Sequence, residues 1–409
     1  MTPEIKHRIE QIKNGEIPKG FKKTKTGVIP TSWKYEKLDS YLIQHHEVST
    51  QNNQYPVLTS SRKGIFFQKQ YYDKEVASED NTGYNVVPRG YFTYRHMSDD
   101  EVFVFNINTI CDKGIVSTLY PVFSVTNSIN PYFLQEMLNN GSDFHKYARI
   151  QKQGGSRTYM YFNKLTKLSI PIPSLDEQKR IMEILSTQDK VIECYEKKIE
   201  QFKQMKKYYL QNMFPKRGET VPKIRFKGFT DPWEQRKVAD VANRYDNLRI
   251  PVAANLRIPG TTPYYGANGI QDYVDGFTHE GEFVLVAEDG ANDLKNYPVK
   301  CVNGRIWVNN HAHVLQSKPE MADNKFLAYF MSQADIESLL VGGGRAKLNA
   351  EVMMGIDLML PSKSEQVAIG QYLTRLDHLI TLHQRKLEEE KKKKKALQQL
   401  LLTGIVRTN

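Results

Sequence analysis

Two arginine residues occupy matched positions in the chain, and each follows a short run of glycine. Arg157 comes after residues 154–155, and Arg345 comes after residues 342–344, at an offset of 188 residues. A guanidinium can form two parallel hydrogen bonds with a phosphate, and glycine lets the backbone approach closely. We therefore predict that both arginines contact a polyanion, with Lys347 as a further cation. A glycine turn that carries a solvent-facing arginine explains the same pattern equally well.

Four other loops combine basic, aromatic and amide side chains. They are "TSSRKG" at 59–64, "PRGYFTYRH" at 88–96, "YYGANG" at 264–269 and "VNNHAH" at 308–313. The amide of asparagine matches the donor and acceptor pattern on the edge of adenine. The residues of these loops that we predict to contact nucleic acid are Arg62, Lys63, Arg89, Tyr94, Arg95, Tyr265, Asn268, Asn309 and Asn310.

Other kinds of chemistry have weak support in the sequence. His311 and His313 would share one face of an alternating strand, but we expect no carboxylate nearby and so predict no metal site. "EDGANDLK" at 288–295 has the residue types of a nuclease site, although turn chemistry explains it more simply. The sequence has no phosphate-binding Gly-x-x-x-x-Gly-Lys-Ser/Thr loop and no Gly-x-Gly-x-x-Gly after a strand. We predict no catalytic residues and no cofactor bound by this chain.

Composition sets the broad class of the protein. The 409 residues are too many for one ordinary core, so two or more domains are expected. A formal net charge of +11 favours a polyanionic partner. The three cysteines are far apart, the first twenty residues lack an apolar signal segment, and no apolar run is long enough to span a bilayer. A cytoplasmic protein is expected.

The chain repeats itself at the offset of 188 residues. "GGSRTYMYFNKLTKLSIPIPSLDEQ" from Gly154 aligns with "GGGRAKLNAEVMMGIDLMLPSKSEQ" from Gly342, and no gap is needed for about sixty residues. Further upstream, Trp33 aligns with Trp233 in a proline-containing element that opens each half. The sequence is therefore a tandem of two homologous units.

A long amphipathic helix follows each Pro-Ser-x-x-Glu-Gln motif. Ser174 and Ser362 can cap these helices, and the glutamate three residues later would complete a capping box. Apolar residues then recur at alternating spacings of four and three, which is the period of a coiled-coil seam. We expect this seam to be polar near His383, Glu390 and Lys394. Its predicted members are Ile181, Leu185, Ile192, Ile199, Phe202, Ile369, Leu373, Leu376, Ile380 and Leu387.

These patterns predict an α+β protein built as a tandem repeat, in which each of two homologous domains leads into a long helix and the two helices bury their apolar stripes against each other. The predicted boundaries are 1–20 for an N-terminal helix and basic loop, 21–172 for the first domain, 173–215 for the first long helix, 216–360 for the second domain, 361–403 for the second long helix and 404–409 for a tail.

This layout resembles the specificity subunit of a type I restriction–modification system. The resemblance covers essentially the whole chain, and its specific part is the pair of motifs from Gly-Gly-x-Arg through Pro-Ser-x-x-Glu-Gln into a long helix. It implies a pseudo-twofold α+β fold in which two long antiparallel coiled-coil helices separate two homologous target recognition domains, each of which reads one half of a gapped DNA sequence. Two readers about one helical turn, or ~34 Å, apart could meet one face of a duplex.

The resemblance also implies the partners of the chain. They would be double-stranded DNA, two methyltransferase subunits and two endonuclease/translocase subunits. S-adenosylmethionine, ATP and Mg²⁺ would be bound by those subunits, which methylate N6 of adenine or cleave unmodified DNA. One alternative is a complete single-chain methyltransferase or restriction enzyme. Another is a structural protein whose helices hold apart two domains that do not bind DNA.

Overall fold

The computed structural model describes residues 2–71, 79–152, 157–216, 218–342 and 346–408. The chain forms two compact units. Unit 1 consists of residues Met1–Glu193 and Glu388–Asn409, and unit 2 consists of Cys194–Leu387. The two boundaries fall within the long helices α6 (Leu175–Asn212) and α10 (Lys363–Leu402), so each unit contains one part of each helix. Among the described residues, no helix has the length and apolar character needed to cross a membrane.

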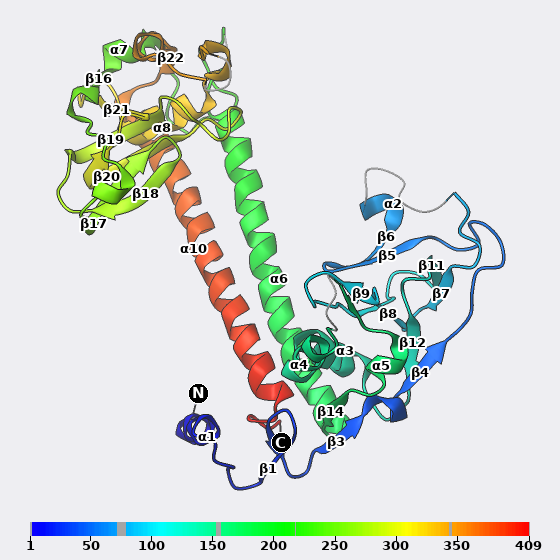
Figure 1. Cartoon of the computed structure of the whole chain (residues 1–409). Coiled ribbons are helices and arrows are strands. Elements are labelled where there is room, and N and C mark those ends of the chain that lie inside the picture. Colours follow the sequence, from blue (N-terminus) through cyan, green and yellow to red (C-terminus); the bar gives the residue numbers. More distant parts are fainter. Residues whose placement is uncertain (1, 72–78, 153–156, 217, 343–345, 409) are drawn as a thin grey trace. The chain divides into compact units, whose positions relative to one another are not determined.

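Unit 1 contains short strands and short helices (Figure 1), and its core combines aliphatic and aromatic side chains. A four-stranded sheet has the order β10-β8-β12-β4, and the other strands form two-stranded ladders. The helices are α1 (Pro3–Lys13), α2 (Gln68–Tyr71), α3 (Pro131–Asn140), α4 (Ser142–Ile150) and α5 (Phe162–Leu165). The strands are β1 (Phe21–Lys23), β2 (Val28–Pro30), β3 (Lys34–Lys37), β4 (Leu42–His45), β5 (Leu58–Ser61), β6 (Gly64–Phe67), β7 (Asn85–Pro88), β8 (Phe92–Thr93), β9 (Met97–Ser98), β10 (Asn106–Ile107), β11 (Lys113–Val116), β12 (Val122–Val125), β13 (Thr158–Tyr159) and β14 (Ser169–Ile172).

Unit 2 is organised around a six-stranded sheet of order β16-β21-β19-β20-β17-β18 (Figure 1). Its core includes the alternate residues Val284 and Val286 of β19 and the buried face of α8. The helices are α7 (Val238–Val241), α8 (Asn324–Gln333) and α9 (Ala350–Met354). The strands are β15 (Glu234–Lys237), β16 (Ala242–Arg244), β17 (Pro259–Gly266), β18 (Gly269–Val274), β19 (His279–Ala287), β20 (Val299–Val308), β21 (Ala312–Ser317) and β22 (Asp357–Leu360).

The glutamine of each repeated motif fixes a second helix to the start of a long helix. In unit 1, Gln178 accepts a hydrogen bond from the backbone N–H of Asn130, the N-cap of α3, at 2.7 Å. In unit 2, Gln366 accepts one from the N–H of Asp323, the N-cap of α8, at 3.0 Å. Both glutamines are fully buried. The repeat therefore encodes one helix junction that is built twice.

The glutamate of each motif forms a buried ion pair and does not close a capping box. Arg407 reaches Glu177 through Nε–Oε1 and Nη2–Oε2 distances of 2.6 and 2.9 Å. Arg225 reaches Glu365 in the same way, at 2.7 and 2.8 Å. Of the predicted capping boxes, the structure shows only the bond from the N–H of Glu177 to Ser174, at 3.3 Å. The capping-box prediction was wrong for the carboxylates, because a bidentate guanidinium offers them a stronger partner than a backbone N–H.

The two long helices run antiparallel within each unit. In unit 1, Gln188 donates to Glu390 at 2.6 Å, and Lys394 pairs with Asp189 at 2.6 Å. In unit 2, His383 lies against the rings of Tyr195 and Phe202. The polar positions of the predicted seam thus have specific partners across the helix pair. Among the predicted seam residues, Ile181, Leu185, Ile199, Ile369, Leu373 and Leu376 are buried, whereas Ile192, Phe202, Ile380 and Leu387 are half-buried.

The tail after α10 is part of the unit 1 core. Gly404 has a φ of +69°, and a Cβ placed there would lie 2.5 Å from Pro30 and 3.0 Å from the ring of Trp33. Only glycine tolerates both the left-handed backbone and this close approach. The guanidinium of Arg8 in α1 donates to the carbonyl of Ile405. The N-terminal helix therefore contacts the segment that follows α10.

We predict that Arg225→Met strongly destabilises unit 2. The side chain of Glu365 is fully buried, and losing its only bidentate partner would leave a charge inside the protein at a cost of ~3–5 kcal/mol. Arg236→Met removes the exposed pair with Glu234 and should cost at most ~1 kcal/mol. Urea unfolding followed by tryptophan fluorescence compares the two variants. Equal shifts of the midpoint would contradict the prediction.

Candidate nucleic-acid interface

Arg62 and Lys63 form the exposed turn between strands β5 and β6 of unit 1, and both side chains point outward. Asn106 supports this turn from below, since its amide donates to Ser60 and to the carbonyl of Ser61, each at 2.9 Å. The guanidinium of Arg62 lies 2.5 Å from a carboxylate oxygen of Asp100. The turn thus presents two cations, and one of them already has an anionic partner.

Three consecutive acids, Asp99, Asp100 and Glu101, form a turn that we call the acidic turn. Each acid pairs with a cation from a different segment. Arg157 Nε lies 2.8 Å from Asp99, and Lys152 Nζ lies 2.7 Å from Glu101, in addition to the pair of Arg62 with Asp100. Two of the three cations are predicted phosphate contacts. These acids were not among the residues selected from the sequence, although the run "SDDE" is an unusual cluster of acids in a basic protein.

The local chemistry keeps Asp100 of the acidic turn charged. The hydrogen bond from Arg62, helped by one from Ser98, lowers the pKa of Asp100 to about 2. Glu101 has a φ of +65°, a left-handed conformation that is uncommon for residues other than glycine. Strained backbone of this kind is often found at functional sites. The three acids therefore lie beside cations that phosphates of a nucleic acid could bind in their place.

The loop at 88–96 gives a mixed result. Arg89 is exposed but pairs with Asp112 at 3.0 Å and donates to the carbonyl of Thr109 at 2.6 Å. Arg95 is exposed, and no ion pair involves it within the described residues. Tyr94 is wrong as a DNA contact, because its ring is fully buried against Phe105 and its hydroxyl donates to the carbonyl of Met160. Burial also raises the pKa of Tyr94.

In unit 2, the loop between β17 and β18 borders a pocket of about 200 Å³. Tyr265 is largely buried, with 6% of its surface exposed, so only its edge could meet a ligand. Asn268 is exposed, but its amide donates to the carbonyl of Gly290 and accepts from the N–H of Asn292, both at 2.9 Å. The Asn268 amide therefore links the β17–β18 loop to the segment at 290–292, and these bonds occupy the groups that would contact a base.

The segment at 305–317 contains the end of β20, a short connection and β21, and the two strands flank β19 on opposite sides. The predicted asparagines lie in this connection. Asn309 is buried and caps the N–H of His311, so the prediction that it contacts DNA was wrong. Asn310 is exposed at the turn and remains a candidate. Lys347 is exposed and pairs with Glu288 at 2.8 Å. Arg345 lies outside the described residues.

Both histidines of this segment, His311 in the connection and His313 in β21, have carboxylate neighbours, contrary to the prediction. His311 lies 2.6 Å from Asp289, and the buried His313 lies 2.7 Å from Asp246. Asp246, Glu288 and His313 are close enough together to ligate a metal ion. Arg249 pairs with Glu288 at 2.6 Å, and Lys347 takes its other oxygen. Two cations already compensate the carboxylates of this cluster, so its geometry is that of a charge network.

Burial and hydrogen bonding act in opposite directions on the acids of this network. Burial raises the pKa of Asp246, but hydrogen bonds from His313 and the N–H of Val314 outweigh it, and the pKa is lowered. Burial likewise raises the pKa of Glu288, and bonds from Lys347 and Arg249 reverse the shift. Both carboxylates are therefore ionised at neutral pH.

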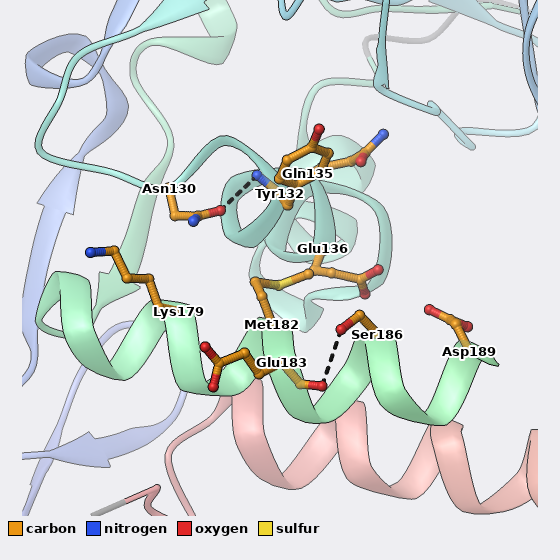
Figure 2. Close-up of a pocket in the computed structure, with 9 residues that line it drawn as sticks. All are labelled: Asn130, Tyr132, Gln135, Glu136, Lys179, Met182, Glu183, Ser186 and Asp189. Carbon is orange, nitrogen blue, oxygen red and sulfur yellow. Dashed lines mark hydrogen bonds between the residues drawn. The ribbon is translucent and has the colours of Figure 1, made fainter. Parts of the chain in front are cut away.

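A separate groove of about 530 Å³ lies between α3 and α6 of unit 1 (Figure 2). Figure 2 shows carboxylates of Glu136, Glu183 and Asp189 along it, with Lys179 at one end. Gln398 donates to Glu136 at 2.9 Å, and Asp189 pairs with Lys394. An acid-rich groove repels phosphates, so this face of unit 1 is not suited to DNA.

Comparison with protein families decides how this arrangement is classified. The family model described as the type I restriction modification DNA specificity domain matches residues 9–204 and again residues 230–391. The two matches together cover most of the chain. The chain belongs to the type I restriction–modification specificity family.

Relatives in this family match either a part or nearly all of the chain. A Haemophilus influenzae protein named as a type I restriction enzyme specificity subunit is 44% identical over 146 residues, which is 36% of this chain and 38% of that protein. A Methanocaldococcus jannaschii protein named as the MjaX specificity subunit is 25% identical over 95% of this chain and 96% of its own length. The MjaVIII specificity subunit of the same organism is 24% identical over 72% of this chain and 75% of its own length.

Solved structures support the fold of the family. The S subunit from M. genitalium has a TM-score of 0.58 at 13% identity, covering 90% of this chain and 96% of that one. A chain of a solved type I R-M system has a TM-score of 0.54 at 14% identity, covering 92% and 99%. The α+β prediction with two homologous regions and long helices is confirmed. Specificity subunits are non-catalytic, and the catalytic activities of these systems lie in other subunits.

The charge network of this specificity subunit predicts that unit 2 loses stability at acid pH. Because the pKa values of Asp246 and Glu288 are lowered in the folded state, their contribution to stability is present above the ordinary carboxyl pKa and is lost as the pH falls through the lowered values. The urea midpoint should therefore decline below about pH 4.

Asp246→Asn should lower the urea midpoint at neutral pH. It should also make the midpoint fall less steeply below about pH 4, because the variant lacks one of the two titrating carboxylates. Asp357→Asn changes an exposed carboxylate of β22 in the same unit and serves as the control. Tryptophan fluorescence follows the transition. An equally steep fall of the urea midpoint at acid pH in Asp246→Asn and wild type would contradict the prediction.

Proposed function

We propose that the chain reads a bipartite, gapped DNA sequence, with one unit contacting each half-site. The supporting observation is that the family model matches the chain twice, once over most of each half. The two units share the buried Gln and Glu–Arg junction but differ in their exposed loops. Different loops on equivalent frameworks are suited to reading two different half-sites.

The exposed cations of unit 1 provide the electrostatic part of this proposal. Arg62, Lys63, Arg95 and Arg157 lie on the loops around β5, β6, β9 and β13, away from the buried junction with α6. Contacts between such cations and phosphates give affinity without sequence information and weaken with salt. Asn310 and Lys347 are the corresponding candidates in unit 2.

We further propose that the chain recruits two methyltransferase and two endonuclease/translocase subunits. Those subunits would bind S-adenosylmethionine, ATP and Mg²⁺ and would carry out N6-adenine methylation or cleavage of unmodified DNA. The groove between α3 and α6, with its acids and the exposed ring of Tyr132, is a protein-docking candidate because its charge is unfavourable for DNA (Figure 2).

Methylation mapping tests the proposed function directly. The full chain is co-expressed with a partner methyltransferase in a host that lacks adenine methylation, and the genome is sequenced for modified adenines. We expect one gapped motif with a modified adenine in each half on opposite strands. An assembled, cofactor-binding complex that leaves no modification would favour the alternative in which the helices space two domains that do not bind DNA.

The acidic turn should restrain non-specific binding. Its carboxylates compete with phosphates for Arg62 and Arg157, so Asp99→Asn with Asp100→Asn should raise affinity for random duplex DNA by about two- to fivefold per freed cation. The specific-to-random ratio should fall, as measured by fluorescence anisotropy of the full chain.

A charge-matched control separates this effect from a change in net charge. Glu234→Gln with Glu280→Gln also removes two exposed acids, each paired with an arginine that we do not place in the interface. An equal rise in affinity for both double variants would mean that the acidic turn has no special role.

A further inference from the structure

Three aromatic side chains gather on the surface of unit 1 beside the predicted phosphate contacts. They are His96, Tyr159 and Tyr161, and we call them the aromatic triad. Tyr159 is 36% exposed and Tyr161 is 47% exposed. Single exposed apolar residues are ordinary, but a contiguous group of exposed rings commonly marks a binding surface. None of the three was selected from the sequence.

The backbone fixes the positions of the triad. From 158 to 161, Thr158 and Met160 point into the core, so Tyr159 and Tyr161 point outward. Strand β13 pairs with β9, with Tyr159 opposite Met97, and the N–H of Met160 donates to the carbonyl of His96 at 2.7 Å. The ladder therefore brings a segment near residue 96 against one near residue 160.

Tyr161 stacks with both of the other rings. Its centroid lies 4.9 Å from that of His96 and 5.8 Å from that of Tyr159, with interplanar angles of 28° and 13°. The rings of His96 and Tyr159 have centroids 6.2 Å apart and are inclined by 34°. The centroids thus define a triangle and not a column. His96 Nδ1 lies 2.6 Å from the carbonyl of Leu119, which holds the imidazole in this orientation.

Charge around the triad favours a nucleic acid as the ligand. Arg95 is adjacent to His96 and exposed, and Arg157 precedes Tyr159 by two residues. A nucleobase offers a flat face to a ring, and its phosphate offers an anion to the neighbouring arginines. Base faces inside an intact duplex are covered by their neighbours, so a face can meet the triad only when that base has left the stack.

We propose that the aromatic triad of unit 1 binds an unstacked base of the bound DNA. This inference rests on the proposed function and specifies one contact between unit 1 and the half-site that it reads. Unit 2 differs: at the offset of 188 residues, Lys347 and Asn349 stand in place of Tyr159 and Tyr161, so unit 2 lacks these two rings. Only the half-site that unit 1 reads is expected to respond to loss of base pairing.

The test uses the full chain and the duplex motif found by methylation mapping. A 2-aminopurine is placed opposite an abasic site in either half-site, and binding is followed by anisotropy and by quenching of its fluorescence. For the wild type, we expect about tenfold tighter binding and strong quenching when the unpaired base lies in one half-site, but not in the other.

Variants assign the effect to the triad. Tyr159→Leu with Tyr161→Leu should remove both the tighter binding and the quenching, while binding to the intact duplex changes less. Tyr159→Phe with Tyr161→Phe keeps the ring faces and should retain both. Tyr208→Leu, at a 52% exposed tyrosine of α6, is the matched control and should behave as wild type.

The outcomes distinguish this inference from the proposed function. A wild-type chain that binds none of the duplexes overturns both. A wild-type chain that binds the intact motif but shows no preference for an unpaired base, or a double leucine variant that keeps the preference, overturns the aromatic contact alone.

Discussion

The buried pairing of a motif glutamate with a distant arginine is the interaction on which each unit depends. Glu177 begins one long helix and is held by Arg407, which follows the other helix. Glu365 begins the second helix and is held by Arg225, which follows the first. The carboxylates are buried, so their desolvation is compensated only when the two segments meet in bidentate geometry. Unit 1 contains the start of α6 and is closed by the segment that follows α10. Unit 2 contains the start of α10 and is closed by the segment that follows α6.

The repeated frame was predictable from the sequence because periodicity and duplication report directly on burial. The seam positions Ile181, Leu185, Ile369 and Leu373 are buried as their spacing predicts. The role of the motif glutamates was not predictable, since local spacing favours a capping box while the true partner is far away in the chain. Long-range ion pairs leave no local pattern in a single sequence.

The interface was predicted less well, and the misses have a common cause. Tyr94 and Asn309 were chosen for residue type, but Tyr94 follows the buried strand β8 and packs against Phe105, and turn geometry buries Asn309. Arg95, the neighbour of Tyr94, was chosen in the same way and is exposed. Residue type alone does not report whether tertiary packing buries a side chain. The acidic turn was missed because cations were sought without the anions that pair with them.

The junction between Glu177 and Arg407 also sets an order for biosynthesis. These residues are 230 positions apart, which corresponds to roughly 10–50 s of translation at 5–20 residues per second. Throughout that interval, the Glu177 carboxylate and the core beside Trp33 have no closing segment. For Glu365 the order is reversed, because Arg225 is already synthesised when the glutamate emerges. The arginine partner of unit 2 is therefore made before its glutamate, whereas unit 1, although begun first, is completed last.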